Sequence, residues 1–331
     1  MSVLLQVEGL TIGFPSGEPV RDLSFSAQRG ETVAIVGESG SGKSLTALAL
    51  MRLLPRSACL RAGSIRLDGT DLATIPESAF RKLRGREIAM IFQEPMTSLN
   101  PVLTIGRQIS ETLRLHEGLS VGQARRRAIE LLDLVRVPDA TRRVNDYPHQ
   151  LSGGMRQRVM IAIAVACKPR LLIADEPTTA LDVTIQAQVL DLLDQLRRDL
   201  GMTLVLITHD LGIVSQWADR VVVMYAGRKV EEALPESLFA AARHPYTQGL
   251  LAASPRLDPL SHYRRNPLPE IPGGIASAAG EPGCAFAPRC GFAQASCRVA
   301  VPEPLAVASG WLVACPIVAR PETSDVAAVG H

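Results

Sequence analysis

Lysine, aromatic residues and excess charge are all scarce in this sequence. Only four of its 331 residues are lysine, and aromatic residues make up 4% beside a hydrophobic fraction of 47%. This composition is typical of an aliphatic globular core and excludes a disordered or fibrous chain. The 35 basic and 33 acidic residues give a formal net charge of +2, so no strong general attraction to nucleic acid or anionic lipid is expected. We interpret the arginine-rich stretches 81–86 and 125–127 as solvated helix faces.

Long apolar runs and export signals are also missing. The longest apolar run in the middle of the chain, 159–167, is about half the length of a membrane-spanning helix. The first ten residues show neither a basic segment nor a cleavage site, so no secretion signal is expected. Six cysteines in such a chain argue against a disulfide framework and favour thiol or metal chemistry.

The stretch 37–44, which reads G-E-S-G-S-G-K-S, has the pattern of a phosphate-binding loop. It follows a Val- and Ile-rich run that predicts a buried strand, and it precedes an apolar stretch of helix length. Glycines let the backbone N–H groups surround a phosphate chain, and the helix start adds its positive dipole end. Lys43 can reach the β- and γ-phosphates of a nucleotide, and the Ser44 hydroxyl can bind Mg²⁺. The alternative is a Gly/Ser-rich turn that binds nothing. The predicted nucleotide contacts in this loop are Gly37, Ser39, Gly40, Gly42, Lys43 and Ser44.

Polar side chains follow three predicted strands at the point where each strand ends. Gln93 follows the run 88–92, Asp175 and Glu176 end the run 171–174, and His209 follows the run 203–208. Ligand-binding residues of α/β sheets lie at such carboxyl ends. Asp175 can join the Mg²⁺ shell, and Glu176 can polarise a water for attack on the γ-phosphate. A lone histidine is usually structural, but at this edge His209 is placed to touch the γ-phosphate.

The segment 151–158, L-S-G-G-M-R-Q-R, begins a long apolar helix. Ser152 is a natural N-cap, and Gly153 and Gly154 would expose bare N–H groups to an anion. A plain capped helix start would explain Ser152 but not two glycines, which cost helix stability. The stretch from 104 to about 139 has helical periodicity and predicts a helical insertion leaning off the sheet.

Residues 4–10 and 23–27 predict antiparallel strands at the start of the chain. Phe14, between them, could stack on a nucleotide base or be an ordinary half-buried core residue, and the sequence favours neither. Near the other end of the predicted sheet, residues 220–225 and 228–232 predict a hairpin that closes it.

Together these motifs resemble the ATP-binding subunit of an ABC transporter over about residues 4–253. The segment 151–158 is the most specific element, because phosphate-binding loops occur in many other NTPases. The resemblance implies that two subunits face each other head to tail, so that Ser152, Gly153 and Gly154 of one reach the γ-phosphate held by the other. It also implies that Asp182 crosses this interface, that Phe14 stacks on adenine and that Gln93 senses the γ-phosphate beside Mg²⁺. In this family His209 would hold the γ-phosphate and orient Glu176.

Two further segments narrow the resemblance. Residues 92–101, F-Q-E-P-M-T-S-L-N-P, and 244–247, H-P-Y-T, resemble the oligopeptide/dipeptide importer branch, which also serves some nickel uptake systems. The implied partners are a second ATPase subunit, two transmembrane permeases and a periplasmic or extracellular solute-binding protein, with no nucleic acid. The implied location is the cytoplasmic face of the inner membrane. Three alternatives stay open: the same motor serving nickel or another small solute, a soluble non-transport ABC ATPase, and a regulatory module that no longer hydrolyses ATP.

Four of the six cysteines, Cys284, Cys290, Cys297 and Cys315, lie in the C-terminal part of the chain. They follow a Pro- and Gly-rich stretch with little apolar core of its own, which favours a metal staple. Zn²⁺ sites usually show closer cysteine pairs, whereas a Cys₄ iron–sulfur cluster tolerates this spacing. The pattern 283–290, G-C-A-F-A-P-R-C, resembles peptide-importer ATPases with a [4Fe–4S] cluster, so we predict a cluster, with Zn²⁺ or free thiols as alternatives. We further expect this segment to pack separately from the phosphate loop.

The sequence therefore predicts an α/β protein with a P-loop ABC-type ATPase core. An antiparallel β subdomain, an inserted α-helical subdomain and a small cysteine-containing extension are expected around this core. The predicted boundaries are 1–253 for the ATPase domain, with its helical subdomain at about 95–168, and 254–331 for the extension.

Overall fold

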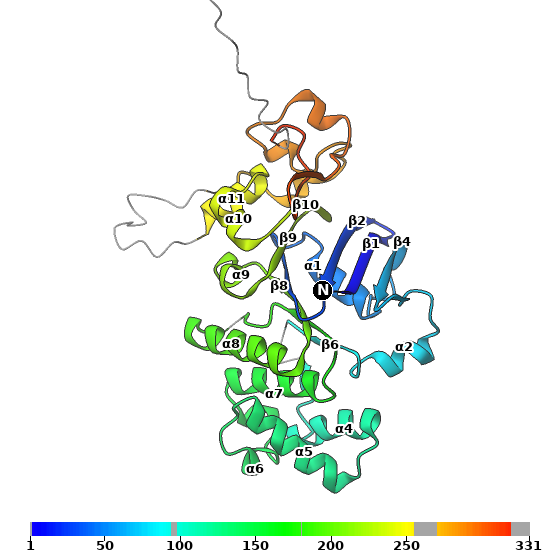
Figure 1. Ribbon diagram of the computed structural model, residues 1–331, viewed down its shortest axis with the longest axis vertical. Coiled ribbons are helices and arrows are strands. Elements are labelled where there is room, and N and C mark those ends of the chain that lie inside the picture. The colour runs from blue at the N-terminus through cyan, green and yellow to red at the C-terminus, as the bar shows by residue number, and fades with distance from the viewer. Residues whose placement is uncertain (1, 94–97, 180, 255–269, 319–331) are drawn as a thin grey trace, which may run out of the picture.

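The computed structural model describes residues 2–93, 98–179, 181–254 and 270–318. Two sheets occupy the middle of an elongated molecule, with helices α4–α6 at one end and the cysteine-bearing extension at the other (Figure 1). The predicted α/β architecture with an antiparallel subdomain and a helical insertion is confirmed.

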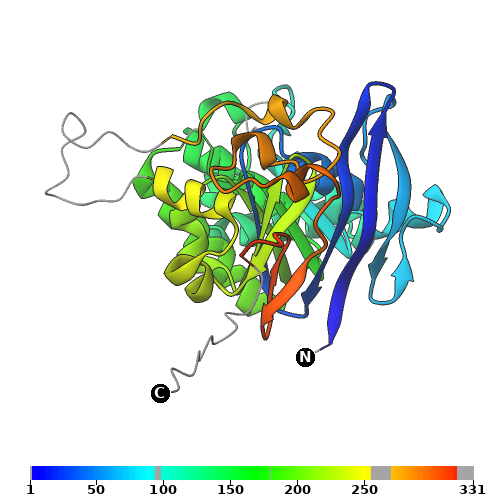
Figure 2. The ribbon, with the colours of Figure 1, turned by 90° about the horizontal axis from the view of Figure 1, so that it is seen from above.

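The smaller sheet is antiparallel, has the order β2-β1-β4-β5 and lies along one side of the molecule (Figure 2). Its first two strands pair along their length, from Val3 opposite Gln28 to Phe14 opposite Gly17. The strands are β1 (Val3–Phe14), β2 (Gly17–Gln28), β4 (Cys59–Leu67) and β5 (Thr70–Asp71).

The main sheet has eight strands in the order β11-β12-β10-β9-β3-β8-β7-β6. Neighbours from β9 to β6 pair in parallel, so the carboxyl ends of these five strands share one edge of the sheet. The strands are β3 (Thr32–Val36), β6 (Ile88–Ile91), β7 (Leu171–Asp175), β8 (Thr203–Thr208), β9 (Arg220–Tyr225), β10 (Arg228–Ala233), β11 (Leu305–Ala308) and β12 (Trp311–Val313). All residues of β3, β6, β7 and β8 are buried, which explains their unbroken apolar runs.

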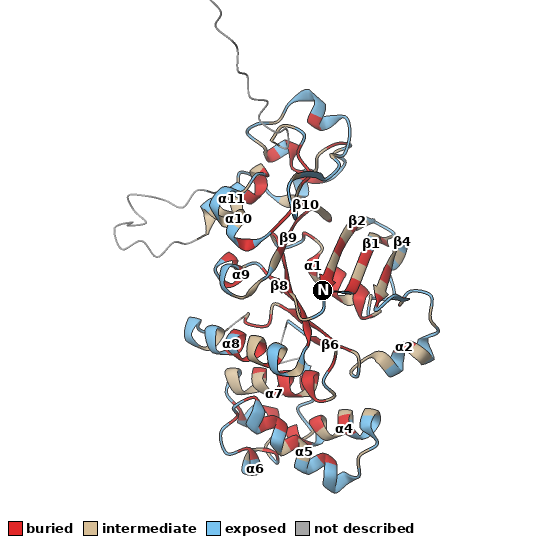
Figure 3. Cartoon of the chain, in the orientation of Figure 1, coloured by how far each residue is buried: buried red, intermediate tan, exposed pale blue. Residues whose placement is uncertain are grey.

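Figure 3 shows that the helices bury one face against the rest of the fold and expose the opposite face. They are α1 (Lys43–Leu50), α2 (Glu77–Leu83), α4 (Ile105–Glu117), α5 (Val121–Leu134), α6 (Ala140–Arg143), α7 (Gly153–Val165), α8 (Val183–Leu200), α9 (Leu211–Trp217), α10 (Pro235–Ala241) and α11 (Pro245–Ala253). Among the described residues, none of these helices has the length and apolar character that a bilayer crossing needs.

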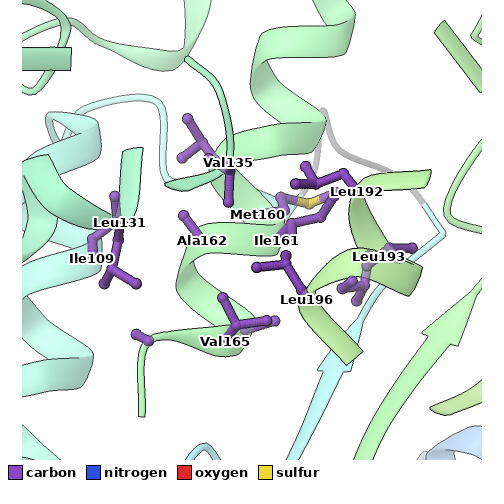
Figure 4. Close-up of a cluster of buried hydrophobic side chains, with 14 of the residues drawn as sticks. Ile109, Leu131, Val135, Met160, Ile161, Ala162, Val165, Leu192, Leu193 and Leu196 are labelled. Carbon is purple, nitrogen blue, oxygen red and sulfur yellow. The ribbon is translucent and has the colours of Figure 1, made fainter. Parts of the chain in front are cut away.

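The helical subdomain is attached to the rest of the molecule through α7. The helical periodicity predicted from 104 to about 139 is confirmed, since Ile105, Ile109 and Leu113 of α4 and Leu131 and Leu132 of α5 are buried on one face of each helix. Figure 4 shows Ile109 and Leu131 on one side of α7 and three leucines of α8 on the other side. One continuous apolar cluster therefore joins the insertion to the sheet.

The hairpin of β9 and β10 is confirmed, but the expectation that it closes the sheet is wrong. Strand β12 pairs with the outer edge of β10, with Glu231 opposite Val313, and Ala314 N–H donates to Val230 C=O at 2.8 Å. Strand β11 then pairs with β12. The free N–H and C=O groups of β10 are thus satisfied by residues from the extension.

The expectation that the extension packs separately from the phosphate loop is also wrong. Phe286 is buried against Tyr225 of β9 and Tyr246 of α11, with ring centroids 5.2 and 5.4 Å apart. Arg289 forms an ion pair with Glu38 of the phosphate loop. The extension has few large apolar residues of its own, so it completes its core on the main domain.

Candidate nucleotide site

The phosphate loop follows β3 and runs into α1, as the sequence predicts. Gly37 and Gly42 adopt φ values of 154° and 97°, in the region that favours glycine. A Cβ at Gly37 would lie 2.2 Å from Met224 C=O, and one at Gly42 would lie 2.7 Å from Pro19 C=O. Both glycines are therefore required by the close approach of neighbouring backbone.

Lys43 is buried and held by the backbone of its own loop. Its Nζ donates to Gly37 C=O at 2.6 Å and to Glu38 C=O at 2.9 Å. Burial lowers the pKa of Lys43, and the carboxylates of Glu176, Asp175 and Glu38 oppose this shift. The loop thus concentrates one cation among carbonyls and acids, an arrangement suited to exchange these partners for phosphate oxygens.

Ser44 and Asp175 are in direct contact at the end of β7. The Ser44 hydroxyl donates to Asp175 Oδ1 at 3.1 Å. Burial raises the pKa of Asp175 to about 6, while the hydrogen bond from Ser44 acts in the opposite direction. A part-buried pair of a hydroxyl and a carboxylate beside a phosphate loop is a donor set that Mg²⁺ prefers, because this ion takes oxygen ligands.

Glu176 contacts side chains that follow the two strands on either side of β7 in the sheet. Its carboxylate accepts hydrogen bonds from Gln93 Nε2 at 3.0 Å and from Thr179 Oγ1 at 2.9 Å, and His209 Nδ1 lies 3.3 Å from Oε1. These residues follow β6, β7 and β8, which are neighbours in the sheet. The structure therefore brings together Gln93, Glu176 and His209 as the sequence predicts.

Thr179 is a contact that the sequence reasoning missed. Its hydroxyl orients Glu176 from three residues further along the chain. The pair Thr178-Thr179, separated from the two acids only by Pro177, was the available signal, since a threonine hydroxyl can turn back to a nearby carboxylate. Glu176 itself has φ of 47°, which is uncommon for a residue with a Cβ and sets its side chain apart from the strand direction.

Ser152, Gly153 and Gly154, which the sequence predicts to contact a partner's nucleotide, lie at the N-terminus of α7. The Ser152 hydroxyl accepts from Met155 N–H at 3.3 Å, which confirms the predicted N-cap. A Cβ at Gly154 would meet Ile185 of α8 at 3.0 Å, and Asp182 caps α8 through Ile185 N–H. Two exposed helix starts, of α7 and α8, are thus placed side by side.

Phe14 lies half-buried at the end of β1, opposite Gly17 of the β1–β2 turn. The next part of β2 reaches the phosphate loop, because Pro19 C=O and Val20 crowd Gly42. Phe14 therefore belongs to a hairpin in contact with the loop, a position compatible with either of its two predicted roles.

The four C-terminal cysteines converge on one cavity, which His244 also lines. All six cysteines of the chain are free thiols. Burial raises the pKa of Cys284 to about 11 and also raises that of Cys290, so these thiols are protonated at neutral pH. The cavity volume is about 10 Å³, room for about one water. In the part of the chain that the structure describes, no three His, Cys, Asp or Glu side chains are arranged to hold a metal, so the predicted metal site is not supported.

Comparisons with known proteins agree with this geometry. The ABC transporter family matches residues 20–179, and the family described as "Oligopeptide/dipeptide transporter, C-terminal region" matches residues 230–297. A peptide import ATP-binding protein of Brucella abortus (strain 2308) is 54% identical over 319 residues, covering 95% of this chain and 94% of the relative. A Brucella melitensis protein of the same description is 53% identical over the same length.

Solved structures give the same result. The ATP-binding cassette MJ0796, a dimer bound to ADP and Pi, superimposes with a TM-score of 0.63 at 28% identity, covering 70% of this chain and 99% of that one. The cbiO1 protein of Clostridium perfringens, part of the cbiONQ transporter complex, gives a TM-score of 0.63 at 27% identity over 73% and 92% of the two chains.

The fold and the loop–carboxylate site define an ATP-binding cassette ATPase. The chain belongs to the ABC transporter ATP-binding subunits of the oligopeptide/dipeptide importer family, as the resemblance implied.

Proposed function

We propose that this chain is the ATP-hydrolysing subunit of an importer of di- or oligopeptides. The observation that carries the proposal is the contact of Glu176 with Gln93 and His209, beside the Lys43–Ser44–Asp175 group. Relatives at 54% identity along nearly the whole chain, named for peptide import, supply the solute class. A motor of this kind works with two transmembrane permeases, a second ATPase subunit and a solute-binding protein, on the cytoplasmic face of the inner membrane.

In this proposal each residue of the site has one role. Lys43 and the N–H groups of the loop, with Gly37, Ser39, Gly40 and Gly42, bind the phosphates of ATP. Ser44, Asp175 and Gln93 would hold Mg²⁺, which would supply positive charge beside the phosphates. Glu176 polarises the attacking water, and His209 holds its carboxylate toward the γ-phosphate.

Other residues complete the site, one of them at the adenine base and the rest from the facing subunit. Phe14 stacks on adenine, and the exposed start of α7, with Ser152, Gly153 and Gly154, closes on the γ-phosphate of the facing subunit. Asp182, which caps the neighbouring helix start, lies at the same interface. We assign residues 1–253 to the ATPase domain, with a helical subdomain at about 95–168, and residues 254–331 to the extension.

The variant Glu176→Gln tests the enzymatic part of the proposal. It removes the water-polarising carboxylate and no proposed phosphate contact, so we expect ATP hydrolysis by the assembled complex to fall about 100-fold or more. ATP binding should stay within about twofold of the wild type. Glu130→Gln, at an exposed site on α5, is the matched control and should hydrolyse ATP normally. Normal turnover in Glu176→Gln would refute the catalytic role.

A transport assay of the complex tests the solute class. Import of Ni²⁺ but of no peptide by the complex would refute that class.

We further propose that Cys284, Cys290, Cys297 and Cys315 hold a [4Fe–4S] cluster. The support is their convergence on one cavity and the softness of thiolate donors, which suits iron–sulfur clusters. The cavity of about 10 Å³ is too small for a cluster, so the sulfurs must move apart and lose their protons to bind one.

Metal analysis of anaerobically purified protein tests this second proposal. We expect about four iron and four sulfide per chain, lost in Cys290→Ser and kept in the control Cys59→Ser, whose thiol is exposed and outside the cavity. Stoichiometric zinc without sulfide would assign the site to Zn²⁺, and absence of both metals would leave four free thiols. Either result refutes the cluster.

A further inference from the structure

Arg289 of the extension has an unusual environment for an arginine. It lies in a 3₁₀ turn, η3 (Ala287–Arg289), and only 4% of its side chain is exposed. All five of its N–H groups are used. Nε donates to Pro272 C=O, one Nη donates to Glu38 Oε2 and Tyr225 Oη, and the other donates to Glu38 Oε1 and Ile271 C=O. Such complete satisfaction of a buried guanidinium fixes its position and that of its partners.

The acid that Arg289 binds is the second residue of the phosphate loop. Glu38 is held at three points: its N–H donates to Tyr246 Oη at 2.8 Å, its C=O accepts from Lys43 Nζ, and its carboxylate accepts both Nη groups of Arg289 at 2.8 and 3.1 Å. Two of these three partners, Tyr246 and Arg289, come from the C-terminal third of the chain. Ile275 of the extension also approaches the loop, 3.6 Å from where a Cβ of Gly40 would lie. The extension is thus an outer wall of the loop.

The ion pair of Arg289 with Glu38 also changes the charge beside the phosphate loop. A free carboxylate at Glu38 would repel the phosphates of a nucleotide and attract the ammonium of Lys43, which already senses its charge. The bidentate pair with Arg289 neutralises the carboxylate and fixes its position.

We infer that Arg289 is a positioning residue for ATP binding, which acts by holding Glu38 so that Lys43 stays available for phosphate. This inference rests on the proposed nucleotide site. The turn that carries Arg289 lies between Cys284 and Cys290 and ends at Cys290, so the arginine also links the cysteine cavity to the loop.

Steady-state kinetics of the assembled complex test the inference. For Arg289→Met we expect the KM for ATP to rise about tenfold with kcat within about twofold, because a paired carboxylate becomes a free one beside the phosphates. Removing that charge as well, in Glu38→Gln/Arg289→Met, should return KM to within about threefold of the wild type. Arg298→Met is the matched control, since it breaks an ion pair in the same extension, between Glu281 and an arginine whose side chain is 53% exposed, and its KM should not change.

Three outcomes would overturn the inference. One is an unchanged KM in Arg289→Met. Another is an equal rise in the KM for ATP in the single and double variants, which would mean that Arg289 acts only by holding Pro272 and Ile271. If Arg289→Met does not fold, Arg289→Lys keeps the charge without the two-point contact and should raise KM about threefold, and no change there would equally refute the inference. Wild-type protein that binds no ATP would instead refute the proposed nucleotide site.

Discussion

At the scale of single residues, His244 shows how burial sets a protonation state. It is fully buried, and its Nδ1 accepts a hydrogen bond from Tyr246 N–H at 3.1 Å as the N-cap of α11. The backbone N–H of His244 donates to Glu231 Oε2, and the residue also lines the cysteine cavity. Burial lowers the pKa of His244 to about 3, so the ring is neutral at every physiological pH.

This shift predicts acid sensitivity of the fold. Between about pH 6.5 and 3 the unfolded chain protonates His244 and the folded chain does not, so the free energy of unfolding falls as pH falls, by about 1.4 kcal/mol per unit. Urea denaturation should show wild type losing about 2 kcal/mol more than His244→Asn between pH 6.5 and 5. Asparagine can keep the cap. The exposed His149→Asn should behave as wild type, and parallel pH profiles for all three proteins would contradict the prediction.

The chemistry of the site was predictable residue by residue because it follows local rules. Gln93, Asp175, Glu176 and His209 each end an apolar run, and parallel strands bring such ends together. The contact of Arg289 with Glu38 spans 251 residues and follows no local pattern, so it needed the structure. The roles of Ser152 and Asp182 across an interface stay predictions.

At the scale of elements, β12 joins the extension to the ATPase sheet through one buried carboxylate. Glu231 of β10 is 1% exposed and accepts from the N–H groups of Arg243 and His244 and from Trp311 Nε1 at 2.9 Å. Arg243 also lies over the Trp311 ring. The sequence predicted β10 and its hairpin partner β9 but not its outer partner β12, because β11 and β12 are short, partly exposed and far along the chain.

Trp311→Phe should therefore weaken the fold. It leaves a smaller aromatic ring in place and removes one hydrogen bond to a buried carboxylate, which should cost about 1–3 kcal/mol of unfolding free energy. Thermal and urea denaturation measure this loss. The other tryptophan supplies the control, since Trp217 donates to the exposed Asp191 and Trp217→Phe should cost less than about 0.5 kcal/mol. Equal costs for the two variants would mean that Glu231 does not dock β12.

At the scale of the whole molecule, the nucleotide site is complete only on one side. The loop, the carboxylates and the extension surround it from within the chain, whereas the exposed starts of α7 and α8 face outward. We propose that a second copy or a related chain completes the other side of this site; the similar MJ0796 cassette, bound to ADP and Pi, is dimeric.

Ser152→Arg tests this pairing. A long cation at the start of α7 should block ATP-dependent dimerisation in a Glu176→Gln background, while the isolated subunit binds ATP as before. Size-exclusion chromatography with light scattering measures the dimer. Ser120→Arg removes the same kind of N-cap from α5, at a cost of about 1 kcal/mol, and should still dimerise. Dimers in the Ser152→Arg protein would exclude a role in the partner's site.

The link between Glu38 and Arg289 also orders events during synthesis. A ribosome makes the phosphate loop early, but Tyr246 and Arg289, which hold Glu38, emerge 208 and 251 residues later. Strand β3 likewise waits for β8 and β9 before it has a neighbour in its sheet. A nascent or truncated chain that ends before Arg289 therefore carries every motif of the ATPase and still has an unsupported loop. We therefore expect such a chain to bind ATP more weakly than the finished protein does. The order in which the fold is built would then keep incomplete products from binding ATP tightly.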